Sequence, residues 1–251
     1  MINFDERIIE LYSKIAKENY VNTINIGLGY TAVELKNGCC GVCCTLIDSH
    51  KTCTVYKVNE DFEDKCCYEV LISLRKYKDP ISRAVVIAMV NALSQLDERL
   101  VENKDNNTLF EDLGLLENKK VAMIGFFNPI VKEFEKRGVN VVAYDIGKDI
   151  GNEEEFYSFV KNESSALIIT ATSFINNTFD FVYEKIINYT NPVAVLGPST
   201  IMNEDLYKDT PVSIIGGTYV SNLSGVLKSI RMGKGTPSIH KSSKKIYKKI
   251  K

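Results

Sequence analysis

The sequence predicts an α/β protein in two parts, an α+β domain over residues 1–106 and a doubly wound parallel sheet over residues 107–251. Three observations lead to this fold class. Val121–Asp145 reads as strand, helix, strand, which is a βαβ unit. The chain after it keeps alternating strands with helices, whereas the chain before it groups a helix, then strands, then helices. The polar, turn-rich stretch Asn103–Thr108 separates the two patterns.

The first part begins with an amphipathic helix and continues into a hairpin. Asn37-Gly38 lies between two β-rich runs, and both residues tolerate the positive φ of a tight hairpin turn. Asp79-Pro80 is a helix start, and the small residues that follow it predict close packing of that helix. The expected elements are a helix over 5–19, strands over 22–29, 31–35 and 39–47, a helix over 64–77 and a long helix from 79–80 to about 100.

The second part is predicted to hold five parallel strands. Asn128 suits a helix N-cap, Pro129 suits the first helical position and Gly138 suits a helix end. The expected strands are 121–126, 139–144, 166–171, 193–196 and 212–216, and the expected helices are 129–137, 153–162, 178–189, 203–207 and 222–232.

Composition excludes several classes of protein. The net charge is −1 in 251 residues, so neither nucleic-acid nor membrane binding is expected from overall charge. No apolar run reaches the length of about 18 residues that spans a bilayer, and the acidic N-terminus is unlike a signal peptide. The seven cysteines do not form a secreted disulfide pattern, so we expect a soluble, cytoplasmic protein. The basic stretch Lys241–Lys251 is predicted to be solvated surface, with RNA or anionic lipid as the alternative contact.

Ligands of open α/β sheets bind beyond the carboxyl ends of the strands. Glycine, asparagine, serine and threonine gather where the predicted strands end, and the alternative interpretation is that these stretches are only turns and caps. The stretches are Gly125–Asn128, Asp145, Ala171–Thr178, Gly197–Thr200 and Gly216–Tyr219.

Asp145 lies about 20 residues after the first predicted strand, where nucleoside-binding folds place a ribose-binding acid. A G-x-G-x-x-G motif is missing, and the stretch Gly125–Asn128 is bulky where a pyrophosphate needs bare backbone. We therefore predict Gly125, Asn128 and Asp145 as cofactor-binding residues for a nucleoside-type ligand rather than for NAD.

The cysteines raise a metal hypothesis. Cys40 and Cys43 have C-x-x-C spacing, but successive side chains of a strand point to opposite faces. The two thiols would then be unable to hold one ion, and buried cysteine behaves as a small hydrophobe. Two interpretations therefore stay open. The first is that the thiols are core residues, and the second is that they are metal ligands, the candidates being Cys39, Cys40, Cys43 and Cys44.

Several segments together resemble the DUF364 family, whose proteins are proposed to chelate heavy metals. The resemblance rests on IGLGYTAVELKNGCCGV, AVVIAMVNAL, VAMIGFF, TATSFINNTFDF, VLGPST and IIGGTYVSNLSGVLKSIRMGKGT. It implies a DUF4213-type first domain similar to the enolase N-terminal fold, a Rossmann-like second domain, and a pocket between them for a flavin-, pterin- or siderophore-like molecule or a heavy metal. By resemblance, the substrate-binding residues are Asn91, Asn176, Asn177, Thr178, Gly197, Pro198, Ser199, Thr200, Gly216 and Gly217.

Three functions follow as hypotheses. The first is a cytoplasmic enzyme or ligand-handling protein that binds a small ring-bearing, metal-linked or metal-free metabolite between its two domains. The second is a heavy-metal binding or delivery protein that uses cysteine thiolates. The third is a regulatory binder without turnover. No catalytic residue is assigned, Glu34 and Asp145 being the candidate general bases, and a homodimer is the default assembly.

Overall fold

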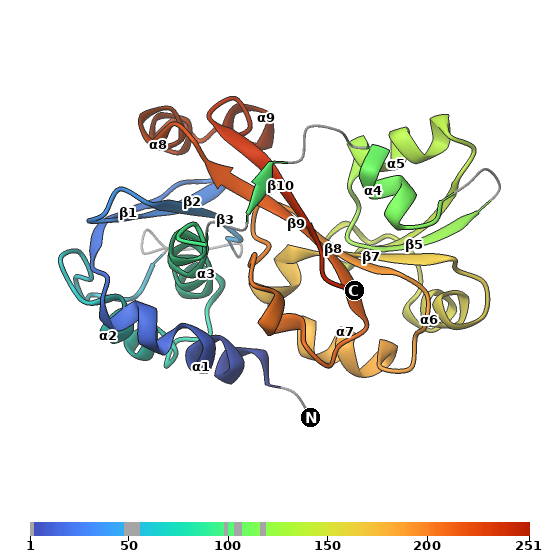
Figure 1. Ribbon diagram of the computed structural model, residues 1–251, viewed down its shortest axis with the longest axis horizontal. Helices are drawn as coiled ribbons and strands as arrows, with labels where there is room; N and C mark the ends of the chain where they lie inside the picture. The colour runs from blue at the N-terminus through green and yellow to red at the C-terminus, as the bar shows by residue number, and fades with distance from the viewer. Residues whose placement is uncertain (1–2, 48–55, 98–99, 103–106, 116–118) are drawn as a thin grey trace.

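Two β-sheets organise the chain in the computed structural model, which describes residues 3–47, 56–97, 100–102, 107–115 and 119–251 (Figure 1). One sheet has three antiparallel strands in the order β1-β2-β3. The other has seven strands in the order β4-β10-β9-β8-β7-β5-β6. The mixed α/β architecture that the sequence predicts is therefore confirmed.

The first part forms the elements that its caps and turn residues predict. The Asn3 side chain accepts the Glu6 N–H to cap the first helix, and Asp79 accepts two N–H groups at the start of the long helix. Gly38 has φ +88° in the hairpin turn, as expected. The elements are α1 (Phe4–Lys17), β1 (Val21–Ile26), β2 (Tyr30–Leu35), β3 (Cys40–Cys44), α2 (Cys67–Leu74) and α3 (Pro80–Ser94).

The second part contains the five predicted parallel strands. Beyond β9 the sheet continues with β10, which is antiparallel to β9, and with β4, which is antiparallel to β10. The order β6-β5-β7-β8-β9 reverses between β5 and β7. The elements are β4 (Val101–Glu102), α4 (Asn107–Asp112), β5 (Lys120–Ile124), α5 (Asn128–Lys136), β6 (Asn140–Tyr144), η1 (Ile146–Lys148), α6 (Glu153–Asn162), β7 (Ala166–Thr170), η2 (Ala171–Phe174), α7 (Phe179–Ile186), β8 (Val193–Leu196), η3 (Glu204–Tyr207), β9 (Val212–Val220), α8 (Leu223–Arg231), α9 (Thr236–Ile239) and β10 (Ser243–Lys249).

Helices cover both faces of the seven-stranded sheet. In Figure 1, α4 and α5 lie on one side of it and α6 and α7 on the other. The two apolar layers follow the period of the strands: Met123 and Ile168 pack with α5, whereas Ala122 and Leu167 belong to the core on the opposite face. The sheet is therefore doubly wound. Folds of this kind bind ligands beyond the carboxyl ends of their parallel strands.

Three expectations from the sequence are wrong. The stretch predicted to be solvated surface forms β10, which pairs antiparallel with β9 and buries Ile246. The strand predicted to end at Gly216 continues to Val220, so Gly216 and Gly217 lie inside β9. Asn128 is the first residue of α5 rather than its N-cap, which is Phe127 and has no side-chain cap bond.

The three-stranded sheet lies between helices from both parts of the chain. Figure 1 shows α3 beneath it, while α8 and α9, from the end of the chain, cover its other face. Side chains of β2 alternate accordingly, since Ala32 packs with the α8 and α9 layer and Val33 packs on the α3 side. Gly41 allows α3 its close approach, because a Cβ there would lie 2.1 Å from the Ala88 carbonyl oxygen.

The N-terminal helix joins the two parts on the opposite side of α3. The Phe4 ring packs edge-on against Phe179 at a centroid distance of 4.6 Å. The Arg83 guanidinium binds both Asp5 carboxylate oxygens and donates to the Phe174 carbonyl at 2.7 and 2.9 Å. Most of the stretch predicted as the boundary, Asn103–Thr108, lies outside the described residues, so the division at residue 106 stays a prediction.

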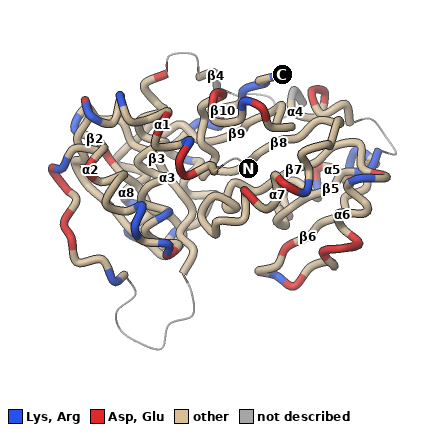
Figure 2. Tube along the Cα trace, turned by 90° about the horizontal axis from the view of Figure 1, so that it is seen from below, with Lys and Arg blue, Asp and Glu red and all other residues tan. Residues whose placement is uncertain are grey.

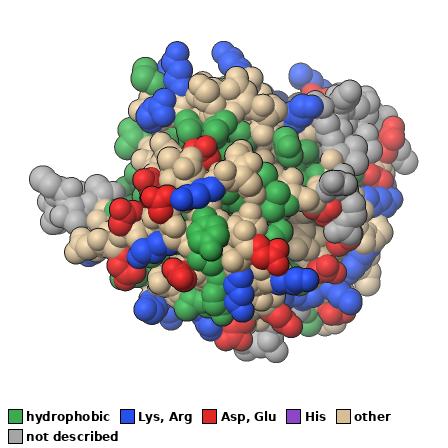
Figure 3. All heavy atoms as spheres, turned by 60° about the vertical axis from the view of Figure 1, so that its left-hand side comes forward, with side chains coloured by type: hydrophobic (Ala, Val, Ile, Leu, Met, Phe, Trp, Pro, Cys, Tyr) green, Lys and Arg blue, Asp and Glu red, His purple; other side chains and the backbone are tan. Residues whose placement is uncertain are grey.

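Charges of both signs are spread over the surface. Lysine and arginine alternate with aspartate and glutamate along the chain in Figure 2, and the face in Figure 3 intersperses both with apolar side chains. Among the residues that the structure describes, no helix is long and apolar enough to cross a membrane.

Candidate functional site

The ends of the parallel strands meet in a row of close glycine contacts. Gly125, after β5, has φ +83°, and a Cβ there would lie 2.6 Å from Thr170 Cγ2 at the end of β7. Gly197, after β8, has φ +132°, its Cβ position lies 3.8 Å from Ala171 Cβ, and its N–H donates to Gly216 O at 3.0 Å. The structure therefore brings these predicted residues to one edge, which includes the point where the strand order reverses.

The free edge of β3 faces this row, and side chains complete its hydrogen bonds. Gln95 Nε2 donates to Cys40 O at 2.6 Å, and Asn91 Nδ2 donates to Val42 O at 3.1 Å. Cys44 N–H donates to Ser199 Oγ at 2.9 Å. A buried strand edge needs such partners. Two of the predicted site residues, Asn91 and Ser199, thus bond to β3 residues that are two positions apart on the same strand edge.

Two buried atoms have no hydrogen bond within the protein where α3 and the turn after β8 bond to the edge of β3, a junction called the seam below. Of the buried side-chain nitrogen and oxygen atoms in the described part of the chain, Asn91 Oδ1 and Thr200 Oγ1 are those without a hydrogen bond in the protein. Asn91 is 5% exposed and Thr200 1% exposed. Leaving a buried polar atom unsatisfied costs about 1–3 kcal/mol, so each such atom calls for a reason.

A partly exposed polar rim leads to the seam. Thr170 and Thr172 join their hydroxyls at 2.9 Å, and both are partly exposed, as are Gly197 and Pro198. The sequence prediction included Thr172 only as part of a stretch and omitted Thr170, Gln95 and Arg83. Asn91 and Gln95 are polar residues four positions apart in a mostly apolar stretch. This helical spacing is the signal that could have identified Gln95.

Of the predicted cofactor residues, Gly125 lies in the row of strand ends, whereas Asp145 is bonded within the turn after β5. Asp145 Oδ2 accepts the Phe126 N–H at 2.8 Å and lies 3.2 Å from Lys148 Nζ. Lys148 Nζ also donates to Phe126 O at 2.7 Å. The Asp145 carboxylate therefore holds the turn after β5, while Asn128 is exposed at the start of α5.

The polar turn before α7 makes its side-chain hydrogen bonds within itself rather than to the seam. Asn176 Oδ1 accepts from the Thr178 hydroxyl at 2.7 Å, and Asn177 takes a left-handed conformation with φ +58°. Both asparagines are exposed. These three residues shape their own turn, as the alternative interpretation of turns and caps expects.

The two glycines inside β9 serve close packing. A Cβ at Gly217 would lie 2.8 Å from Met202 Sδ and 3.3 Å from Thr200 O. A Cβ at Gly216 would lie 2.8 Å from Leu196 Cδ2. Their contribution to the site is therefore to let the chain after β8 lie directly on β9.

The cysteines of β3 point to opposite faces, as predicted. Cys40 packs in the layer under α8 and α9, whereas Cys43 packs in the core on the α3 side. Burial raises the pKa of Cys40 to about 12, and burial raises the pKa of Cys43 further, although Ser199 and Arg83 oppose the shift. Both thiols therefore stay protonated at neutral pH, whereas soft metals bind the thiolate.

A metal centre of several side chains is not formed by the residues with described positions. Among them, no group of three or more histidine, cysteine, aspartate and glutamate residues is arranged to hold an ion. Glu34, a candidate base, instead accepts from the Thr23 hydroxyl at 3.1 Å on the neighbouring strand.

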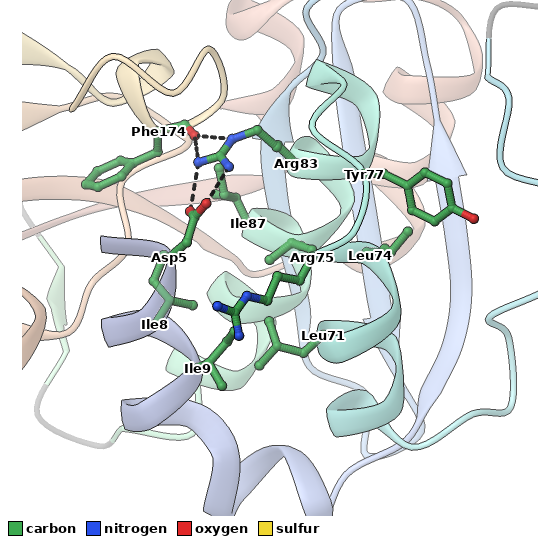
Figure 4. A pocket seen from close by; sticks show the side chains of 11 residues that line it. Asp5, Ile8, Ile9, Leu71, Leu74, Arg75, Tyr77, Arg83, Ile87 and Phe174 are labelled. Carbon is green, nitrogen blue, oxygen red and sulfur yellow. Dashed lines mark hydrogen bonds and ion pairs between the residues drawn. The ribbon is translucent and has the colours of Figure 1, made fainter. Parts of the chain in front are cut away.

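A small cavity lies between α1, α2 and α3, away from the seam (Figure 4). Most of its lining side chains are apolar, and Figure 4 shows Arg83, Asp5 and the Phe174 carbonyl joined at one end. Its volume of about 40 Å³ is far below the 300 Å³ or more that is typical of a site for a drug-sized molecule. It adjoins the strand-end edge only through Phe174.

Comparison with known proteins identifies the family. Residues 108–249 match the DUF364 model and residues 9–94 match the DUF4213 model, both described as "Putative heavy-metal chelation". An uncharacterized protein of Methanocaldococcus jannaschii is 25% identical over 249 residues, which are 96% of this chain and 94% of that protein.

Two solved structures have a similar fold. A DUF364 protein of unknown function from Pyrococcus horikoshii aligns with a TM-score of 0.78 at 20% identity, over 98% of this chain and 100% of that one. A DUF364 protein of unknown function from Desulfitobacterium hafniense aligns with a TM-score of 0.73 at 14% identity, over 97% and 98%. With more than half of its length matched by the family model, the chain belongs to the DUF364 family.

Proposed function

We propose that this protein binds a small, ring-bearing metabolite where β3 and α3 meet the ends of β7 and β8. The observation that supports it is the pair of unpartnered buried atoms, Asn91 Oδ1 and Thr200 Oγ1. Both residues belong to the substrate-binding set that the family resemblance implies. Buried polar groups without a partner are rare and recur at binding sites, where the ligand supplies the missing bond.

The proposal includes a division into two domains. An enolase N-terminal-like domain over residues 1–106 would supply Asn91 from α3. A Rossmann-like domain over residues 107–251 would supply Gly197, Ser199 and Thr200 from the turn after β8. Open parallel sheets bind ligands beside the position where the strand order reverses, and in this chain that position carries the Thr170 and Thr172 hydroxyls.

In this proposal a heavy metal arrives as part of the ligand. The thiols of β3 are split between two faces, and burial keeps their pKa high. Oxygen and nitrogen atoms of a chelating metabolite would then hold the ion, and the protein would hold the metabolite. This reading is compatible with the family description without a thiolate cluster.

The test compares native and denaturing mass spectra of the protein purified without oxygen. An excess mass of a few hundred daltons that disappears on denaturation supports the proposal, and fragmentation of the released molecule identifies its class. Thr200→Val should lose the excess. The matched control is Thr210→Val, which should keep it, because Thr210 is also buried but bonded to Tyr207 O and the Val212 N–H.

Cysteine-bound metal is the competing outcome of the same experiment. An excess equal to a metal ion, removed by a chelator and absent after Cys39, Cys40, Cys43 and Cys44 are replaced by serine, would favour a metal-binding or delivery protein. That result would overturn the metabolite proposal.

A further inference from the structure

We infer that one corner of the molecule, where the β1–β2 turn meets the end of α8, docks on a lipid membrane that carries negative charge. This corner, called the tip below, consists of residues 27–29 and 230–234. Three features of the tip support such a partner: its packing, the apolar side chains that it exposes and the charges beside them. None of its residues belongs to the seam, so membrane docking goes beyond the proposed function.

Glycine packing builds the tip from two distant segments of the chain. A Cβ at Gly27 would lie 2.6 Å from Ile230 O. A Cβ at Gly233, whose φ is +63°, would lie 3.3 Å from Leu28 Cδ1. The turn therefore lies directly on the end of α8, and Leu28 lies next to the segment that carries Met232.

The tip exposes two large apolar side chains. Leu28 is 75% exposed and Met232 is 65% exposed. A single apolar side chain on a surface is ordinary, whereas adjoining ones mark a contact surface. In Figure 1, α8 lies at the upper border of the molecule, above β1 and β2. The pair is therefore placed to enter the boundary between head groups and acyl chains, as the apolar side of an interfacial anchor does.

Cations accompany this apolar pair. Lys228, Arg231 and Lys234 are exposed, and the ion pairs of the described residues include none of them. Residues 210–251 contain nine lysine and arginine residues but no aspartate or glutamate, although the net charge of the chain is −1. Both signs of charge occur on the face in Figure 3, but its upper border carries mainly lysine and arginine. The expectation drawn from overall charge therefore averages over an uneven distribution.

An anionic bilayer matches both features of the tip. Phosphate head groups attract the cations, while the acyl boundary accepts Leu28 and Met232. A second copy of this chain would set the cations of one tip against those of the other, and two side chains fall far short of the roughly 1,200 Å² that a stable interface buries. Nucleic acid would pair with the cations, but bases stack on aromatic rings, and the tip has none.

The first test measures partition of the full chain onto vesicles by co-sedimentation. We expect binding to phosphatidylcholine vesicles with about 30% phosphatidylserine, and binding at least tenfold weaker to phosphatidylcholine alone. Raising the salt from about 0.1 M to about 1 M should weaken binding, because it screens the charges. Replacing Arg231 and Lys234 together by glutamine should weaken it about 20-fold, since each cation near the surface contributes roughly fivefold.

The apolar pair has its own matched control. Leu28→Ser combined with Met232→Ser should weaken binding at least tenfold, since each buried methylene contributes about fourfold. The control is Ile146→Ser combined with Ile187→Ser, at side chains that are 72% and 53% exposed and lie outside the tip. It should bind like the unaltered chain.

A tryptophan probe tests insertion directly. The chain has no tryptophan, so the emission of Leu28→Trp reports on the tip alone. It should shift to shorter wavelength when vesicles with phosphatidylserine are added, because the indole leaves water. Ile187→Trp should show no shift.

Several results would overturn the inference. They are no partition onto vesicles with phosphatidylserine, partition that the serine variants of the tip leave unchanged, and an unshifted emission of Leu28→Trp. Binding of single-stranded RNA without binding of vesicles would show that the cations serve nucleic acid instead. The comparison of two vesicle compositions on the unaltered chain needs no variant to fold, and the mass spectra judge the proposed function separately.

Discussion

Thr200 carries a hydroxyl that the folded chain does not use. Replacing it with valine keeps the shape of the side chain and removes the buried oxygen that lacks a partner within the protein. We predict that Thr200→Val raises the free energy of unfolding of the ligand-free protein by about 1 kcal/mol. Urea denaturation measures it.

Thr210 is the matched control for that substitution. It is 3% exposed, donates to Tyr207 O at 2.6 Å and accepts from the Val212 N–H at 3.2 Å. Thr210→Val should therefore lower the free energy of unfolding by about 1–3 kcal/mol. Equal destabilisation by both substitutions would mean that the Thr200 hydroxyl is satisfied in solution.

The thiols of β3 give a second prediction for single residues. Burial raises the pKa of Cys40 and Cys43 far above neutral, and reaction with iodoacetamide requires the thiolate. At pH 7.5 both should stay unmodified in the native protein, while Cys39 and Cys66, which are partly exposed among the cysteines that the structure describes, react before them. Peptide mass mapping after a short exposure checks this. Rapid native labelling of Cys43 would contradict the packing described for β3.

The sequence predicted which residues are candidates for the site, but it did not predict their hydrogen-bond partners. The sequence identified Asn91, Ser199 and Thr200 through a family resemblance, and alternation along a strand placed Cys40 and Cys43 on opposite faces. It could not show that Asn91 and Ser199 bond to the edge of β3, because that edge lies more than 40 residues from Asn91 and more than 150 from Ser199 along the chain. Hydrogen-bond partners so distant depend on tertiary packing.

At the scale of elements, the contact between α3 and β3 depends on one glycine. A Cβ at Gly41 would lie 2.1 Å from Ala88 O and 2.2 Å from Ala92 N, and both are backbone atoms of a packed helix. We predict that Gly41→Ala lowers the free energy of unfolding by more than about 3 kcal/mol, because α3 has to move away. Urea denaturation monitored by circular dichroism provides the measurement.

Gly147 is the control for this substitution. Its Cβ would lie 3.4 Å from Asp145 Oδ1, an ordinary contact, and its φ is not positive. Gly147→Ala should change the free energy of unfolding by less than about 1 kcal/mol. Similar losses at both glycines would show that Gly41 acts through chain flexibility rather than through helix approach.

Physical reasons explain why the sequence patterns did not predict β10 or the full length of β9. β10 has two pairs of neighbouring lysines, a composition typical of solvated surface, yet lysines also protect strands near the edge of a sheet. Among the strands that the structure describes, only the two-residue β4 pairs with its outer side. In β9 the pair Gly216-Gly217 suggested a strand end, whereas the strand continues because those glycines accommodate Leu196 and Met202.

At the scale of the whole molecule, the two parts of the chain complete each other. The sequence predicted both patterns of elements in order, but it did not predict that α8 and α9 would cover the sheet of the first part. Val226, Ile230 and Ile239 share a buried cluster with Tyr30 and Cys40. On the other side, Phe4 packs among aromatic rings of the second part. Neither contact could be read from the sequence, since both join segments more than 150 residues apart.

This interlocking predicts how a fragment behaves. Residues 1–106 alone would expose the β-sheet face formed by Tyr30, Ala32, Cys40 and Val42, together with Phe4. Exposed apolar surface of this kind removes the main driving force for folding. We predict that this fragment shows no cooperative thermal transition, whereas mixing it with residues 107–251 restores one, measured by calorimetry. A fragment that melts cooperatively alone would mean that α8 and α9 are dispensable, and that the seam can open as a hinge between two independent domains.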